Sequence, residues 1–277
     1  MAKKLSQKIE TERVESTEEV APESVSLSES VVVERTKSTR QKSFVMDLRI
    51  HSPPSLGYLG IEGIDTAPAL VRLAKVKGLD VIAVTDFYSG HYIDRIMAAA
   101  IGSEVTVIPG VVIRCCVAGC DDVTLSCLFP QTSTTAKIEE FLTALKIPES
   151  ARGNRQYLVR TPFENILQLI EAFDGIALPS RMDKTPHRIN AIPALVEKYG
   201  IRTFDLAYHD STKIFKKNWP KIKFNLFSFS NANALAQVGS RIARVKLSEP
   251  SFAAISQLMA RDMKKGRGGE GKPGASR

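Results

Sequence analysis

Polar residues that could do chemistry stand at the ends of two predicted buried strands. Phe44, Val45, Met46 and Leu48 form a short apolar run that contains Asp47 and is followed by His51. Asp86 follows a second apolar run over 81–84. The second run has no polar interruption, which is typical of a strand inside a parallel sheet. Carboxylate and imidazole groups at the carboxyl ends of parallel strands build the site of a (β/α) barrel. The two stretches therefore predict one site on an α/β barrel.

The motif order resembles the polymerase and histidinol phosphatase (PHP) superfamily. That family opens with Asp-x-His-x-His-Ser and continues with Thr-Asp-His, matched here by 47–52 and 85–87. Its later motifs, Pro-Gly-x-Glu, Pro-x-His-x-Asp and Ser-Asp-x-His, are matched by 109–112, 179–183 and 230–233. The resemblance covers about residues 43–260 and implies a PHP-like fold, a distorted (β/α)7 TIM-like barrel.

The same resemblance implies a site that has lost most of its metal ligands. PHP-like enzymes are implied to hold up to three divalent ions with His, Asp and Glu, and the ions activate water for attack on a phosphoester. Asp47, His51, Asp86 and Asp183 keep a side chain that can coordinate. The replaced positions are Arg49, Phe87, Val112, Thr124, Arg181, Asn231 and Asn233. Arginine is not a ligand and repels cations, so we expect no bound metal, no other cofactor and no assigned catalytic residue.

Two interpretations of this altered site remain open. In the first, Arg49 and Arg181 fill the vacated volume and pair with Asp86 and Asp183. In the second, the arginines act with Lys184, His187 and Asn231 to bind a phosphate or carboxylate. The degenerate or anion-binding site is assigned to Asp47, Arg49, His51, Asp86, Arg181, Asp183, Asn231 and Asn233.

The function that follows is that of a catalytically inactive relative of metal-dependent phosphoesterases, acting as a binding or regulatory module. A residual metal-dependent hydrolase is one alternative. An interaction protein for RNA or a ribonucleoprotein is another, because the net charge is +8 and Arg152, Arg155 and Arg160 cluster in one connection. The expected partner is a phosphate-containing ligand or an RNA or protein complex.

Composition divides the 277 residues into a barrel with two tails. Residues 1–42 are rich in Glu, Ser, Lys and Thr, which predicts a disordered tail; residues 43–260 form the barrel; and 261–277 form a basic, Gly-rich tail. No run of 18 apolar residues and no secretory block occurs, so we expect a cytoplasmic protein without a membrane partner. Cys115, Cys116, Cys120 and Cys127 lack paired C-x2-C spacing, so they are expected to be reduced and buried as small hydrophobic residues.

Helical and strand periods alternate along the chain. The helix that begins after Asp65 or Thr66, the two candidates for its N-cap, ends at Gly78. Thr161 and Glu164 have capping-box spacing before another helix. Further helices are expected over 91–100, 135–146, 188–199 and after 250, with strands over 105–113, 123–129, 176–178, 202–207, 222–229 and 243–247.

Overall fold

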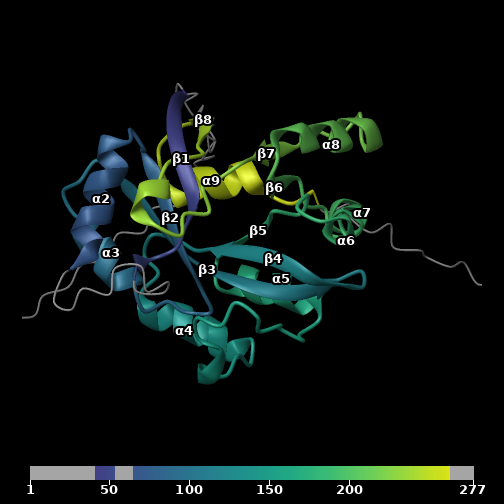
Figure 1. Cartoon of the computed structure of the whole chain (residues 1–277), viewed down its shortest axis with the longest axis horizontal. Coiled ribbons are helices and arrows are strands. Elements are labelled where there is room, and N and C mark those ends of the chain that lie inside the picture. The colour runs from purple at the N-terminus through teal and green to yellow at the C-terminus, as the bar shows by residue number, and fades with distance from the viewer. Residues whose placement is uncertain (1–40, 54–64, 263–277) are drawn as a thin grey trace, which may run out of the picture. The chain divides into compact units, whose positions relative to one another are not determined.

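The computed structural model describes residues 41–53 and 65–262, which belong to one compact unit. The predicted tails, apart from their few residues nearest the barrel, lie outside these described residues. Within them, strands and helices alternate as the sequence predicts (Figure 1). None of the helices in this part is long and apolar enough to cross a membrane.

Eight strands of the described part form one mixed sheet in the order β7-β6-β5-β4-β3-β2-β1-β8. Neighbours pair in parallel except at β3–β4, β4–β5 and β1–β8. All but β4 and β8 therefore run in one direction, and their carboxyl ends share one end of the sheet. The strands are β1 (Lys42–Ile50), β2 (Val81–Phe87), β3 (Thr106–Val117), β4 (Cys120–Leu128), β5 (Ile176–Ser180), β6 (Thr203–Asp205), β7 (Asn225–Phe227) and β8 (Ala243–Leu247).

The segment after β7 nearly closes the sheet into a barrel. It continues from β7, the strand at the edge of the sheet, to β1 at the other side. There the amide of Ala232 donates to the carbonyl of Arg49 at 3.2 Å, and the amide of His51 donates to the carbonyl of Ala232 at 3.1 Å. Buried apolar residues of β1, such as Met46 and Leu48, pack with Phe229 of that segment. The predicted α/β TIM-like barrel is confirmed.

The barrel departs from a regular (β/α) repeat at β3 and β4. Ala118 and Gly119 join these strands with φ of 49° and 79°, the left-handed pair that a two-residue type I′ hairpin requires. A parallel connection would need a crossover of a dozen residues or more. Because β4 runs against its neighbours, its first residues, and not its last, lie at the end where β3 and β5 finish.

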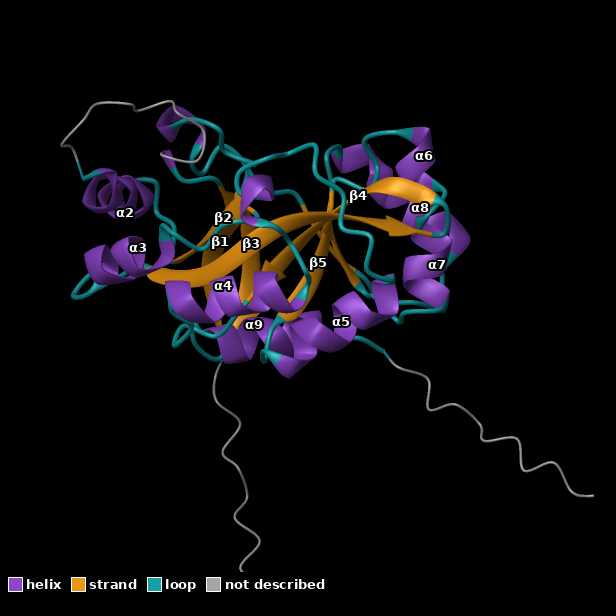
Figure 2. Cartoon of the chain, turned by 90° about the horizontal axis from the view of Figure 1, so that it is seen from below, coloured by secondary structure: helices purple, strands orange, loops and turns teal. Residues whose placement is uncertain are grey.

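Helices cover the strands on several sides. Figure 2 shows α4, α5 and α9 along one side and α6, α7 and α8 together at one end, while Figure 1 shows α2 and α3 near β1 and β2. The bounds are α2 (Thr66–Val76), α3 (Ile93–Ala100), α4 (Thr135–Ala144), α5 (Phe163–Ala172), α6 (Pro186–Ile189), α7 (Ile192–Glu197), α8 (Thr212–Asn218) and α9 (Phe252–Met259), with 3-10 turns at Glu149–Ala151, His209–Ser211 and Leu235–Gln237.

Two local predictions about helices are wrong, and one is confirmed. The Asp65 carboxylate accepts the Ala67 amide at 3.1 Å and caps α2 as expected. The Thr161 cap is wrong, because α5 starts after Pro162 and no side chain caps it. The helix expected over 188–199 is two short helices, α6 and α7, because Pro193 near the start of α7 has no amide to continue the preceding turn. Helix α8 was not predicted.

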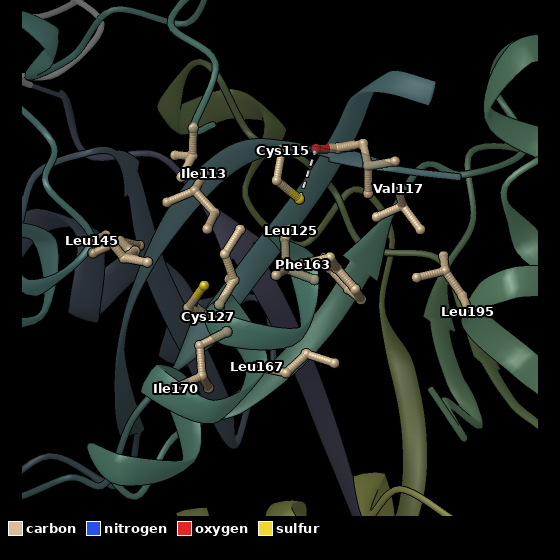
Figure 3. Close-up of a cluster of buried hydrophobic side chains, with 14 of the residues drawn as sticks. Ile113, Cys115, Val117, Leu125, Cys127, Leu145, Phe163, Leu167, Ile170 and Leu195 are labelled. Carbon is tan, nitrogen blue, oxygen red and sulfur yellow. Dashed lines mark hydrogen bonds between the residues drawn. The ribbon is translucent and has the colours of Figure 1, made fainter. Parts of the chain in front are cut away.

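The largest buried cluster packs β3 and β4 against α4, α5 and α7. Figure 3 shows Cys115 and Cys127 among its aliphatic and aromatic side chains. Cys115, Cys120 and Cys127 are buried, as predicted for small hydrophobic residues, and burial raises the pKa of the Cys120 thiol. Cys116 is exposed, so the prediction is wrong for that residue.

Candidate functional site

A polar pocket of about 450 Å³ lies at the carboxyl ends of the parallel strands. Its lining comes from the ends of β1 and β2, the β3–β4 hairpin, the connection before α5, and the segments that follow β5 and β7. Six cationic side chains line it, and we call it the cationic pocket: Arg49, Arg114, Arg155, Arg181, Lys184 and Arg188. Among the acidic residues, Asp122 alone is part of the described lining.

Arg49 is held by a buried ion pair that the sequence analysis missed. Its Nη1 lies 3.2 Å from Oδ2 of Asp205, and the two side chains are 4% and 0% exposed. Asp205 also accepts the Phe229 amide at 3.0 Å. Burial lowers the pKa of Arg49 and raises that of Asp205, and the charge of each partner opposes the other's shift. Within the described residues, Nε of Arg49 is buried without an acceptor.

Asp122 satisfies two of the six cations. Arg114 donates from Nε and Nη2 to Oδ1 at 3.1 and 2.8 Å, while Arg188 donates from Nε and Nη2 to Oδ2 at 2.9 and 2.8 Å. Partial burial alone would raise the pKa of Asp122, but hydrogen bonds and charge from Arg188 and Arg114 hold it below the usual value. Asp122 reaches this end of the barrel because β4 is antiparallel.

The other three cations keep charge available to the pocket. In the described part of the chain, Arg155, Arg181 and Lys184 form no ion pair. Arg155 donates to Oδ1 of Asn233 at 3.2 Å and lies 5.6 Å from the Phe87 ring centre. Arg181 has a left-handed backbone with φ of 55°, and its amide donates to the Asp205 carbonyl at 2.5 Å. A non-glycine residue in this conformation is strained by about 1–2 kcal/mol.

His51 is a neutral imidazole on the wall of the cationic pocket. Its ring stacks on Phe87 with centres 5.3 Å apart and planes 19° apart. Burial, followed by the charges of Arg49 and Arg155, lowers the pKa of His51 to about 3. A hydrogen bond with Asn231 opposes that shift without cancelling it. The side chain therefore carries no charge near neutral pH.

Each carboxylate of the predicted site accepts backbone amides. Asp47 accepts from Ser230 at 3.2 Å and Gly239 at 3.0 Å. Asp183 accepts from Ala207 at 2.6 Å and Tyr208 at 2.8 Å.

Asp86 makes its described hydrogen bonds with Ser52, from the amide at 2.7 Å and from the hydroxyl at 2.5 Å. The predicted pairing of Arg49 with Asp86 or Asp183 is therefore wrong, because Arg49 pairs with Asp205. Arg181 does not form the predicted pair with Asp183 among the described residues.

The family's metal cluster does not fit this donor set. Both oxygens of Asp183 already accept amides, and the Arg49 guanidinium occupies the space beside the strand ends. Across 41–53 and 65–262, no three His, Cys, Asp or Glu side chains gather in a way that could hold a metal ion.

The predicted site residues fall into two sets. The residues that line the cationic pocket are Arg49, His51, Arg181, Asn231 and Asn233. Asp47, Asp86 and Asp183 are buried and are not part of that lining. Of the accessory residues, Lys184 lines the pocket, whereas His187 lies 3.8 Å from Asp121 on the surface.

Sequence reasoning missed Asp205, Asp122, Arg114 and Arg188. Asp205 had one available signal, which is a carboxylate between Phe204 and Leu206 in an apolar strand. Nothing in the spacing of Asp122, Arg114 and Arg188 indicates that they meet.

Comparison with known proteins identifies the fold. No protein-family model matches the chain, and no curated protein matches its sequence. A solved structure from Bifidobacterium adolescentis, which carries the name of a metal-dependent phosphoesterase, is similar with a TM-score of 0.50 at 10% identity, over 79% of this chain and 97% of that one. An amidohydrolase from Chromobacterium violaceum, solved with sulfate and no metal, is similar with a TM-score of 0.52 at 13% identity, over 72% and 90%. The chain thus has the α/β TIM-like barrel fold of these two proteins.

Proposed function

We propose that the chain is a non-catalytic member of the PHP superfamily that binds a phosphate-containing anion in the cationic pocket. The observation that carries the proposal is the charge of that pocket. Its six cations face two carboxylates, Asp122 and Asp205, so the balance is 6 − 2 = +4. An anionic ligand is the natural counter-charge for such a surface.

The chemistry of the free donors favours phosphate. A guanidinium presents N–H groups in a fixed fork that matches phosphate oxygens, and a lysine adds a point charge. Arg181 and Lys184 follow β5 closely, and Arg155 stands across the lining beside Phe87. A volume of about 450 Å³ lies within the usual range for small-molecule sites. The ligand therefore has room for a phosphate and a polar substituent.

The same side chains argue against hydrolysis of the bound anion. A metal-dependent phosphoesterase needs carboxylates free to coordinate cations, whereas Asp47 and Asp183 are used by backbone amides. Burial and the charges of Arg49 and Arg155 keep His51 unprotonated, so it has no proton to give to a leaving group near neutral pH. Binding without turnover is the function these contacts support, and residual metal-dependent hydrolysis is the alternative that experiment should test.

Calorimetric titration with inorganic phosphate and with pyrophosphate tests the proposal. We expect saturable binding that Arg181→Gln weakens at least tenfold, because this change removes a charge that has no partner in the described part of the protein. Arg72→Gln is the matched control, since Arg72 is an exposed arginine of α2 outside the pocket. Equal affinity of the two variants, or the absence of any binding, contradicts the proposal.

A further inference from the structure

A second cationic surface lies away from the cationic pocket, on helix α8 and the turn that follows it. Residues 209–224 contain five lysines and one aspartate, so this segment carries 5 − 1 = +4 of the chain's net +8. The lysines are Lys213, Lys216, Lys217, Lys221 and Lys223, and all are exposed. We call this surface the lysine ridge. In Figure 1 helix α8 extends beyond β6 and β7, on the side of the sheet opposite α2 and α3.

Four charges of the lysine ridge are unbalanced. Lys213 pairs with Asp210 at 2.9 Å, and both side chains are largely exposed. Within the described residues, Lys216, Lys217, Lys221 and Lys223 form no ion pair. Like charges this close repel one another, and a polyanion relieves that repulsion by replacing small counterions.

The ridge is built on a rigid base. Phe215 of α8 packs on Phe204 of β6 with ring centres 5.0 Å apart and on Phe224 at 5.2 Å. The ring centre of Trp219 lies 6.0 Å from those of Phe215 and Phe224, and its Nε1 donates to Oε1 of Glu197 at 3.0 Å. These contacts fix α8 and the turn after it against β6 and α7. The backbone that carries the lysines is therefore held in place.

An exposed aromatic ring lies just before the N-terminal end of α8. Tyr208 is 54% exposed and lines a cleft of about 300 Å³ with His209, Thr212 and Arg244. Its amide is held by the Asp183 carboxylate at 2.8 Å. Thr212 is the first residue of α8, so the cleft that Tyr208 lines includes the start of the helix that carries three of the lysines.

We propose that this surface binds single-stranded nucleic acid, with the phosphodiester backbone along the lysine ridge and an unpaired base stacked on Tyr208. A basic track combined with an aromatic platform is the combination that single strands require. An anionic membrane is the less suitable partner, because the exposed large apolar side chains described at this surface are Tyr208 and Ile242 alone, whereas entry into lipid requires a continuous apolar face. The proposal is independent of the phosphate site proposed above.

Fluorescence anisotropy with labelled 20-nucleotide oligo-dT and oligo-U, at a series of salt concentrations, tests the proposal on the full chain. The test variant is Lys216→Gln, Lys217→Gln, Lys221→Gln and Lys223→Gln together. We expect at least a tenfold loss of affinity, and a salt slope that falls by about 3, since each phosphate contact on a single strand contributes about 0.7.

Two control variants each remove four positive charges from other parts of the chain. One changes the scattered exposed residues Lys42, Lys77, Lys146 and Lys246 to Gln, and the other changes Lys264, Lys265, Arg267 and Lys272 to Gln. Neither is expected to weaken binding more than threefold. A loss in the second control equal to that of the ridge variant overturns the proposal, because binding would then reside in the C-terminal segment.

The role of Tyr208 has its own readout. Tyr208→Ala is expected to weaken binding of the single strand about fivefold or more and to leave binding of a duplex of the same length unchanged. Tyr208→Phe is expected to bind the single strand as the wild type does, because stacking needs the ring and not the hydroxyl. Capture of the protein by phosphatidylserine vesicles without any binding of the oligonucleotides overturns the proposal. Intact phosphate binding by the ridge variant shows that any loss is separate from the cationic pocket.

Discussion

Arg49 is the residue on which the interior of the site depends most. It stands where the family pattern has a metal ligand, and it neutralises Asp205, which is fully buried. A buried ion pair contributes little relative to apolar residues, but removing one partner leaves the other charge buried and unpaired. The stability of the barrel therefore depends on Arg49 even though Arg49 is not a catalytic group.

Arg49→Met is expected to lower the free energy of unfolding by about 3–5 kcal/mol. Arg181→Met should change it by about 0.5 kcal/mol or less, because its guanidinium is only partly buried and has no ion pair in the described chain. Adding Asp205→Asn to Arg49→Met should recover part of the loss, since the neutral amide oxygen can still accept the Phe229 amide. Urea unfolding measures all three, and an Arg49→Met variant as stable as the wild type contradicts this account.

His51 makes the fold sensitive to acid. Its pKa is lowered to about 3 in the folded protein by burial and by the Arg49 and Arg155 charges, whereas in an unfolded chain it is about 6.5. Between these values the unfolded state binds the proton and the folded state does not, so the free energy of unfolding decreases as pH falls below about 6.5. From pH 6.5 to pH 5 this residue should remove about 1.5 kcal/mol.

His51→Gln should abolish that part of the pH dependence. Asp47 acts in the opposite sense, because burial raises its pKa to about 6 and the folded state then binds the proton more readily as pH falls. The wild type and His51→Gln both contain Asp47, so the difference between their free energies of unfolding at pH 7 and pH 5 isolates the contribution of His51. Parallel curves for the two proteins would contradict the assigned neutral imidazole.

At the scale of elements, the end of α7 depends on Gly200. Its φ is +66°, and a Cβ atom there would overlap the backbone of Asp262, whose amide donates to the Gly200 carbonyl at 2.8 Å. That contact fastens the segment after α9 to the turn before β6. A side chain at this position therefore meets both a strained backbone and an occupied space.

Gly200→Ala is expected to destabilise the protein more than Gly102→Ala does. Gly102 has a similar φ of +74° but nothing within 4 Å of the added Cβ, so its substitution costs about 1–2 kcal/mol of backbone strain. Gly200→Ala should cost about 1–3 kcal/mol more from overpacking. Thermal unfolding of both variants checks which of them is destabilised more. Equal melting temperatures would show that the backbone at Asp262 moves away from the added Cβ at little cost.

At the scale of the whole molecule, the arrangement of charges predicts independence from metal ions. Backbone amides occupy Asp47 and Asp183, and Arg49 places a fixed positive charge beside them through its pair with Asp205. Chelator should leave the melting temperature unchanged, and added Mn²⁺ should not produce hydrolysis of a phosphomonoester. Arg49→His combined with Phe87→His should not rescue hydrolysis, because Val112, Thr124 and Arg181 still lack ligating side chains. Metal-dependent turnover that is lost in His51→Ala would refute the non-catalytic proposal.

Periodicity and motif order sufficed to predict much of this protein. Apolar runs before His51 and Asp86 predicted β1 and β2, because strand burial and turn chemistry are local properties. The barrel was predicted from the resemblance of the motifs, in their order, to those of a known superfamily. Helix α8 was not predicted, since its seven residues combine three lysines with few apolar positions. Its place is decided by aromatic contacts with Phe204 and Phe224, which lie outside the helix.

The partners of the site residues were decided only by tertiary structure. The resemblance implied that Arg49 stands at a ligand position, but its pairing with Asp205 spans 156 positions along the chain. Asp122 meets Arg188 because one strand of the sheet runs against its neighbours and brings its first residues to the site. Which carboxylate neutralises which arginine depends on barrel closure and strand direction, and spacing along a chain carries no information about either.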